Sequence, residues 1–157
     1  MMRQVTLCYL VNDEEILMGM KKRGFGEGKL NGYGGKLKPN EALKTGAVRE
    51  LSEECGVETS EEELQKVGEI AFYFPEKPEW DQVVHIYLVE SWSGEPQETD
   101  EMRPAWYRRD DLPFDEMWDI DRHFLPKILD GKSVKGNATY SADQKLIEHT
   151  LETTPLQ

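Results

Sequence analysis

Residues 35–57 read GKLKPNEALKTGAVRELSEECGV, and this stretch decides the fold. It fits the pattern G-x5-E-x7-R-E-U-x-E-E-x-G-U, where x is any residue and U is a bulky apolar residue, at every specified position. A chance match of this length and detail is very rare, so the stretch carries a specific structural and chemical function. The matching residues are Gly35, Glu41, Arg49, Glu50, Leu51, Glu53, Glu54, Gly56 and Val57.

The middle of this stretch is predicted to be a helix. Asn40 is a good N-cap, and Glu41 follows in the first turn, where the helix dipole favours an anion. Before Cys55 only Gly46 weakens the helix, by roughly 1 kcal/mol relative to Ala. Gly56 then suits a left-handed C-terminal cap. We therefore expect the helix to start at Asn40 and to end at Cys55.

Three glutamates of this helix share one face. Glu50, Glu53 and Glu54 stand at positions i, i+3 and i+4, and such neighbouring carboxylates repel each other unless a cation lies among them. Hard oxygen ligands of this kind suit Mg²⁺, with Mn²⁺ as the alternative. Arg49 precedes Glu53 by four residues and can orient that carboxylate. A solvated acidic helix face is the ordinary explanation of such a charge run, but the complete pattern favours the metal site.

The length and charge of the chain limit its function. A chain of 157 residues fits a single domain, which we place at residues 1–157. The net charge of −12 argues against a nucleic-acid polymer or an anionic membrane as the partner. Residues 21–38 differ from this acidic average, because they hold six basic residues and one acidic residue. A basic loop beside an acidic helix favours a polyphosphate substrate.

The two cysteines, Cys8 and Cys55, have no metal-binding spacing and are interpreted as buried thiols in a reducing compartment. No basic leader with a cleavage site and no long apolar run is present. We therefore expect a cytoplasmic protein with no membrane segment, acting as a monomer on a small molecule.

The remaining pattern predicts mostly strands, with a second helix near the C-terminus. Pro126 of that helix is expected in the first turn, where proline is tolerated. The last two strands are expected to form a hairpin. The resulting fold class is α/β (α+β), an α/β/α sandwich around a mixed central sheet. The expected strands are 5–11, 16–20, 67–74, 83–89, Trp106-Tyr107, 134–140 and 146–151, and the second helix is 122–129.

The motif at residues 35–57 resembles the Nudix box, which implies a Nudix-type fold and a divalent-metal hydrolase that cuts a diphosphate linkage. A closer resemblance, to one group within this family, is carried by four further stretches, residues 19–26, 31–36, 100–104 and 113–118. Over about residues 4–153 the chain is similar to the oxidised purine nucleoside triphosphate hydrolases, the animal MutT homologues. This resemblance implies magnesium-dependent hydrolysis of 8-oxo-dGTP or 2-hydroxy-dATP to the monophosphate and pyrophosphate, which sanitises the nucleotide pool.

The resemblance also implies roles for single residues. Glu53 or Glu54 would be the general base, with Arg49 beside them, and the resemblance does not decide between the two glutamates. The implied metal ligands are the Gly34 carbonyl, Glu50, Glu53, Glu54 and Glu101. The implied substrate-binding residues are Thr6, Lys21, Phe25, Asn31, Phe72 and Trp118 around the nucleoside, with Tyr33, Gly34, Gly35 and Lys36 along the phosphates.

One segment departs from this family. The family reads the purine with two adjacent aspartates, whereas this chain has Trp118-Asp119-Ile120-Asp121. Asp121 aligns with the second aspartate and Ile120 replaces the first, so one base contact is lost or moved. Asp119 could replace it, and we include both Asp119 and Asp121 among the substrate-binding residues.

Two other functions are compatible with these residues. The chain could be a Nudix hydrolase for another substrate, such as an ordinary or alkylated dNTP, ADP-ribose or a dinucleotide, and Ile120 is the best support for this. It could also be a non-catalytic nucleotide-binding module. The complete set Glu50, Glu53 and Glu54 argues against the second alternative, because a binding module need not keep the base and every ligand.

Overall fold

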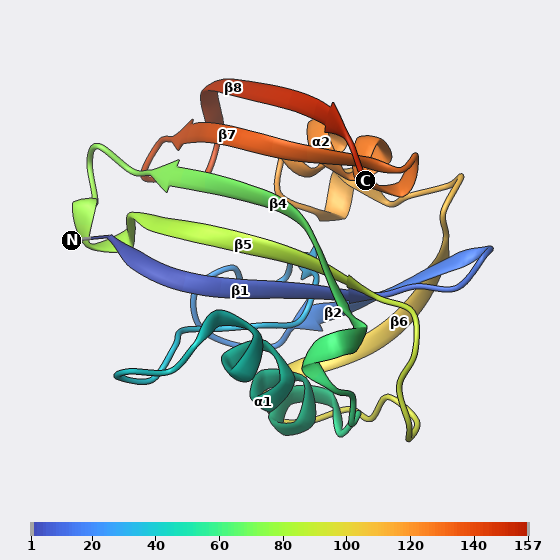
Figure 1. The fold of residues 1–157 in the computed structure, drawn as a ribbon. Helices are drawn as coiled ribbons and strands as arrows, with labels where there is room; N and C mark the ends of the chain where they lie inside the picture. The colour runs from blue at the N-terminus through green and yellow to red at the C-terminus, as the bar shows by residue number, and fades with distance from the viewer. Residues whose placement is uncertain (1, 157) are drawn as a thin grey trace.

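The computed structural model describes residues 2–156, which form two β-sheets and two α-helices (Figure 1). Three short 3-10 turns lie at Glu61–Glu63, Pro78–Trp80 and Phe114–Glu116. The strands are β1 (Arg3–Leu10), β2 (Glu15–Lys21), β3 (Leu30–Asn31), β4 (Leu64–Tyr73), β5 (Gln82–Val89), β6 (Met102–Arg108), β7 (Lys132–Tyr140) and β8 (Leu146–Pro155), and the helices are α1 (Leu43–Cys55) and α2 (Asp121–Leu129).

The larger sheet is mixed, as expected, with the strand order β1-β5-β4-β7-β8. β1 runs parallel to β5 and β4 runs parallel to β7, while the other two pairings are antiparallel. A second, antiparallel sheet has the order β3-β2-β6. The division into two sheets is a tertiary feature that the strand pattern did not indicate. The expected C-terminal hairpin is confirmed as β7 and β8.

Helix α1 starts later than the sequence pattern predicted. Its N-cap is Ala42, whereas Asn40 lies in a turn with a positive φ of 64°. The prediction of Asn40 as the N-cap is therefore wrong. The physical reason is that Glu41 accepts a hydrogen bond from the Lys38 N–H at 2.9 Å, which closes a turn ahead of the helix. At the other end, the left-handed cap at Gly56 (φ 73°) is confirmed.

Helix α2 starts at Asp121, so that Pro126 is its sixth residue. The prediction that this proline lies in the first turn is therefore wrong. Pro126 has no N–H to donate to the Arg122 carbonyl, yet the helix continues to Leu129 because its apolar side packs on the larger sheet. Phe124, Leu125 and Ile128 of α2 are fully buried there.

The larger sheet separates two cores, because alternate residues of β1 point to opposite faces. Val5 and Tyr9 belong to the first core, which α2 covers, and Cys8 and Leu10 belong to the second core, which α1 covers. Figure 1 shows α1 below β1 and α2 beside β7. The two cores hold α1 and α2 against opposite faces, and β1 lies between them. A ligand near β1 can therefore meet residues that both helices position.

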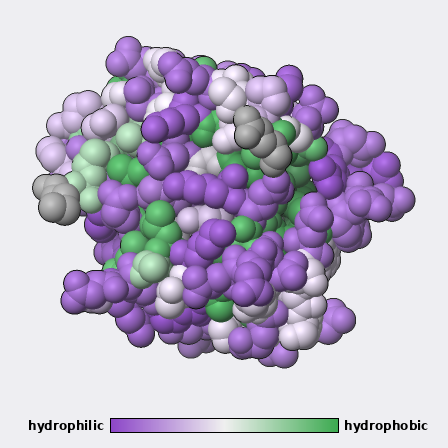
Figure 2. All heavy atoms as spheres, viewed as in Figure 1, coloured by the Kyte–Doolittle hydropathy of each residue, from purple (hydrophilic) through white to green (hydrophobic). Residues whose placement is uncertain are grey.

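The surface agrees with the acidic, polar composition. Figure 2 shows a largely hydrophilic face with separate hydrophobic patches. No helix within residues 2–156 is both long and apolar enough to cross a membrane. Cys8 and Cys55 are free and buried, as expected, and burial raises the pKa of the Cys55 thiol to about 11. Burial raises the pKa of the Cys8 thiol as well, so the reactive thiolate form is disfavoured at both positions.

Candidate active site

Arg49 is the central contact of the α1 carboxylates. Its guanidinium donates to Glu50 Oε1 at 2.8 Å and to Glu53 Oε2 at 3.1 Å. It also donates to both carboxylate oxygens of Glu41, at 2.8 and 2.9 Å, and these bonds lower the pKa of Glu41 to about 2. A further bond of 3.2 Å reaches the Lys36 carbonyl oxygen. Arg49 thus joins the helix to the loop before it and orients Glu53, as its spacing predicted.

Glu54 is the buried carboxylate of the helix. Glu54 is 8% exposed, and its Oε1 accepts a hydrogen bond of 3.2 Å from the Gly34 N–H. Burial, and then the nearby charge of Glu50, raises the pKa of Glu54 to about 7. Both effects destabilise the ionised form, and a cation placed beside Glu54 would relieve both.

Gly34 and Gly35 bring the backbone close to β1 and α1. A Cβ atom on Gly34 would overlap the carbonyl group of Thr6, and a Cβ atom on Gly35 would lie 2.9 Å from the Glu50 carboxyl. The Thr6 N–H donates to the Gly35 carbonyl at 3.0 Å, which fixes the segment beside the edge of β1. The segment needs glycine here because a side chain would separate it from the strand or the helix.

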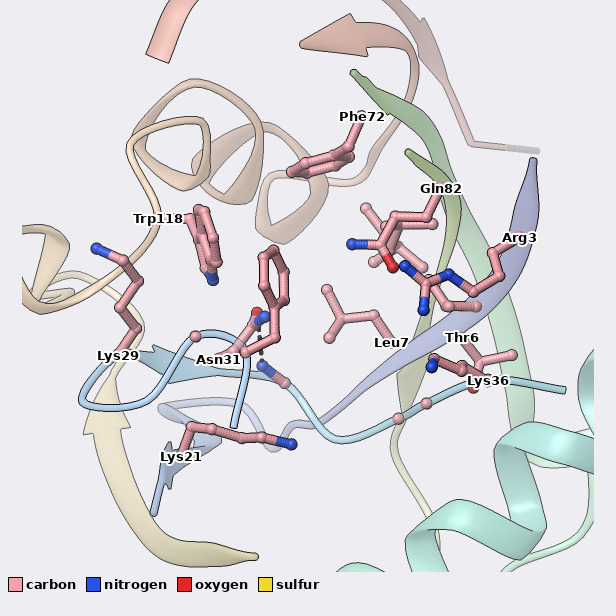
Figure 3. Close-up of a pocket in the computed structure, with 18 of the residues that line it drawn as sticks. Arg3, Thr6, Leu7, Lys21, Lys29, Asn31, Lys36, Phe72, Gln82 and Trp118 are labelled. Carbon is pink, nitrogen blue, oxygen red and sulfur yellow. Dashed lines mark hydrogen bonds between the residues drawn. The ribbon is translucent and has the colours of Figure 1, made fainter. Parts of the chain in front are cut away.

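A cavity of about 450 Å³ opens beside this segment (Figure 3). It brings together residues from β1, the glycine-rich segment at residues 24–35, α1, β4 and the segment before α2. Figure 3 shows Trp118 and Phe72 on one side of the cavity and Thr6, Lys36 and Arg3 on another. The predicted site residues that line it are Thr6, Lys21, Phe25, Asn31, Gly34, Gly35, Lys36, Glu54, Phe72, Trp118 and Asp121.

The side of the cavity away from α1 is aromatic. Phe72 stacks on Tyr140 with ring centroids 5.8 Å apart, and Trp118 meets the same tyrosine edge-on at 5.2 Å. Phe25 lies against Trp118, with the ring centroids 5.3 Å apart and the ring planes tilted by 31°. The flat faces of these rings can bind another flat aromatic group by stacking.

Polar groups without protein partners lie in the same cavity. Asp121 is 3% exposed and Thr6 is 2% exposed. Within residues 2–156, neither the Asp121 Oδ2 atom nor the Thr6 hydroxyl has a hydrogen-bond partner. Burial raises the pKa of Asp121 well above its usual range, so this carboxyl can donate a proton in a hydrogen bond. Asn31 Oδ1 accepts from the Gly32 N–H at 2.9 Å and from the Tyr9 hydroxyl at 3.3 Å, and Asn31 lines the cavity. Unpartnered buried groups of this kind indicate a ligand with its own donors and acceptors.

Comparison with known families identifies the chain. The model of the NUDIX domain matches residues 1–128. This chain belongs to the Nudix family. The Nudix box at residues 35–57 therefore contains α1, and we call α1 the Nudix helix.

Two Nudix relatives match this chain over nearly its whole length. The oxidized purine nucleoside triphosphate hydrolase of Mus musculus is 39% identical over 149 residues, covering 95% of this chain and 94% of that protein. The protein of the same description from Danio rerio is 40% identical over 148 residues, covering 94% and 93%. A MutT protein of Bacillus halodurans has a crystal structure that superposes with a TM-score of 0.84 at 22% identity, covering 96% of this chain and 98% of that one. This last likeness confirms the Nudix fold.

Among the residues considered for substrate binding, Tyr33, Asp119 and Ile120 lie outside the cavity. Tyr33 was expected along the phosphates, but its backbone pairs with Cys8 and its side chain is buried in the second core beneath the Nudix helix. Asp119 was expected at the base, but it is exposed and its Oδ2 accepts from the Leu146 N–H at 3.4 Å. Ile120 is buried in the first core and does not line the cavity. Asp121 is thus the aspartate of this segment that lines the cavity.

The other predicted metal ligands are paired with basic side chains. Arg49 contacts Glu50 and Glu53, while Arg23 contacts Glu101 at 2.7 Å and Lys21 lies 3.7 Å from the same carboxylate. Within residues 2–156, no three acidic, histidine or cysteine side chains are gathered closely enough to hold a metal ion. A cation would therefore bind by drawing these carboxylates away from their basic partners.

Several cavity residues were not among the predicted site residues. Trp80 packs against Phe25 with ring centroids 5.1 Å apart, and Lys29 places its ammonium 5.3 Å from the centre of the Trp118 ring. Lys29 belongs to the basic loop noted in the sequence. Trp80 lies in a Pro-bearing loop, where the sequence pattern predicts neither a helix nor a strand. The others are Arg3, Val5, Leu7, Gly26, Gly32, Phe74, Gln82, Val84, Ile86, Met102 and Phe124.

Proposed function

We propose that this protein hydrolyses oxidised purine nucleoside triphosphates, such as 8-oxo-dGTP or 2-hydroxy-dATP, to the monophosphate and pyrophosphate. The reaction would keep damaged purines out of the nucleotide pool. The observation that carries this proposal is the identity of 39% and 40%, over nearly the whole chain, to the oxidized purine nucleoside triphosphate hydrolases of Mus musculus and Danio rerio.

The cavity supports the same substrate. A purine can stack against the aromatic side formed by Phe72 and Trp118, while Asn31 and the unpaired Oδ2 of Asp121 offer hydrogen bonds to its edge. The triphosphate would then extend toward Gly34 and the Nudix helix, where close-packed backbone and basic side chains favour phosphate. In this arrangement the base and the phosphates meet the two chemically different sides of one cavity.

Nudix hydrolases generally use divalent metal ions, and the residues of this chain fit such an ion. The donor set consists of hard oxygens, and burial of Glu54 beside Glu50 creates a need for positive charge. We propose Mg²⁺, held by the Gly34 carbonyl, Glu50, Glu53, Glu54 and Glu101. When bound, the ion would supply positive charge that neutralises the charge developing on the phosphates.

We propose that Glu54, rather than Glu53, accepts the proton of the attacking water. Glu54 lines the cavity, whereas the Glu53 side chain is 54% exposed and is oriented by Arg49. The water oxygen would bond to a phosphorus of the triphosphate, the bridge between the α and β phosphates would break, and pyrophosphate would leave. Lys21 and Lys36 line the same cavity and would stabilise the negative charge of the phosphates. We propose that the protein acts as a monomer in the cytoplasm, a reducing compartment in which its two buried thiols stay free.

One observation favours a second candidate, a Nudix hydrolase for differently modified purine nucleotides. Asp121 is the aspartate of residues 119–121 that lines the cavity, since Asp119 faces solvent and Ile120 faces the core. One carboxyl offers fewer hydrogen bonds to the base edge than two, so an alkylated or an ordinary purine could bind equally well.

The deciding experiment is pyrophosphate release in the presence of Mg²⁺ from 8-oxo-dGTP, 2-hydroxy-dATP, O6-methyl-dGTP and dGTP, compared as kcat/KM. We expect an oxidised purine to be preferred at least about tenfold, which corresponds to roughly 1.4 kcal/mol. Equal rates on all four would support the second candidate instead. No release from any nucleotide would leave a non-catalytic binding module.

Replacement of Asp121 by Ala should weaken recognition of the base. A hydrogen bond from a buried acid is removed, so we expect kcat/KM for the preferred purine to fall roughly 10–100-fold. The matched control is Asp119→Ala, which removes an exposed aspartate two residues away and should change kcat/KM less than about twofold. Equal losses in the two variants would contradict the assignment of Asp121 to the base.

A further inference from the structure

Arg3 begins β1 at the edge of the cavity and has no part in the function described so far. In the larger sheet it pairs with Gln82 of β5, which in turn pairs with Phe72 of β4. Paired residues of neighbouring strands point to the same face, and strands lie about 4.8 Å apart. One row across the sheet therefore runs from the aromatic Phe72 to Arg3, over two strand spacings or roughly 10 Å.

Lys36 lies next to this row, on the same face of the sheet. It pairs with Val5, so its side chain points to the face of β1 that also carries Arg3. Lys36 directly follows Gly35, which contacts the Nudix helix. Figure 3 shows the side chains of Arg3 and Lys36 on the same side of the cavity, with Thr6 and Gln82. Two basic residues from different segments thus flank the region into which the phosphates would extend.

The hydrogen-bonding capacity of Arg3 is largely unused. Within residues 2–156 its guanidinium donates one hydrogen bond, of 2.8 Å, to the Glu79 carbonyl, although it carries five N–H donors. Among residues 2–156, neither Arg3 nor Lys36 forms a salt bridge, whereas Lys21 is paired with Glu101 and Lys29 lies over Trp118. Because a guanidinium matches the geometry of phosphate oxygens, Arg3 is suited to bind one.

We propose that Arg3, together with Lys36, binds the terminal phosphates of the substrate and selects nucleoside triphosphates over diphosphates. This inference rests on the proposed function, since it assigns Arg3 and Lys36 to the end of the substrate that lies opposite to the base. The base binds at Phe72, the scissile bridge lies beside Gly35 and Glu54, and the departing pyrophosphate lies between Lys36 and Arg3. A diphosphate substrate lacks the terminal group that Arg3 contacts.

The test compares the wild type with Arg3→Gln on 8-oxo-dGTP and 8-oxo-dGDP. We expect kcat/KM for the triphosphate to fall about tenfold and that for the diphosphate to stay within about twofold. Arg108→Gln, which removes an exposed arginine remote from the cavity, should leave both values unchanged. A merely structural effect, such as loosening of the loop that Arg3 holds through Glu79, would lower kcat/KM equally for both substrates. That result would overturn the proposal.

A second measurement does not depend on turnover. Calorimetric titration with inorganic pyrophosphate should show binding about tenfold weaker in Arg3→Gln, with unchanged binding of 8-oxo-dGMP. Unchanged pyrophosphate affinity would refute the role of Arg3 even in an active enzyme. Failure of the wild type to hydrolyse either oxidised nucleotide would instead refute the proposed function, so the two failures are distinguishable.

Discussion

Replacing Glu54 by Gln is expected to lower the turnover of the preferred nucleotide by roughly 10²–10⁴, the usual scale for a positioned base. Glutamine keeps the size of the side chain and can still accept the hydrogen bond from the Gly34 N–H. It cannot accept a proton from water or supply negative charge to a cation. The measurement is kcat for pyrophosphate release at saturating nucleotide and Mg²⁺.

Two controls make this result specific. Glu62→Gln removes one exposed glutamate outside the cavity and should leave kcat unchanged. The melting temperature of Glu54→Gln should not fall, because the substitution removes a buried carboxyl whose ionised form is already disfavoured. Near-normal turnover in Glu54→Gln would exclude Glu54 as the base and would leave Glu53 for that role.

Replacing Gly34 by Ala is expected to produce the second large effect. The new methyl group would overlap the Thr6 carbonyl, so the segment 33–36 must move away from β1. We expect the free energy of unfolding to fall by about 1–3 kcal/mol or more. We also expect kcat/KM to fall at least about 100-fold, since a displacement near 1 Å misplaces the groups that hold the phosphates.

Gly136→Ala is the matched control for this substitution. A Cβ atom on Gly136 would overlap the Thr150 carbonyl in the β7–β8 pair, which is the same kind of clash at a position outside the cavity. This variant should lose comparable stability, measured by urea unfolding, yet keep kcat/KM per folded molecule within about threefold. A similar loss of activity in both variants would show that Gly34 acts through stability alone.

The sequence was most informative where local spacing carries the information. The face shared by Glu50, Glu53 and Glu54, the contact from Arg49 to Glu53 and the left-handed cap at Gly56 follow from helical geometry within a few residues. The prediction failed at Asn40, where capping propensity was outweighed by bonds from Lys38 and Arg49 to Glu41. Such bonds connect residues that a local pattern cannot pair.

By itself, the sequence determined the Nudix helix and the mixed α/β class, because a complete motif specifies its own backbone, and it named eleven of the twenty-four residues that line the cavity. Only the tertiary structure decided that Asp121 faces the cavity while Asp119 faces solvent, and that Arg3, Gln82 and Phe72 form one row. Sequence neighbours diverge at a turn, and strand register joins residues that are distant in the chain. Both outcomes depend on packing between elements, which is a property of the whole fold.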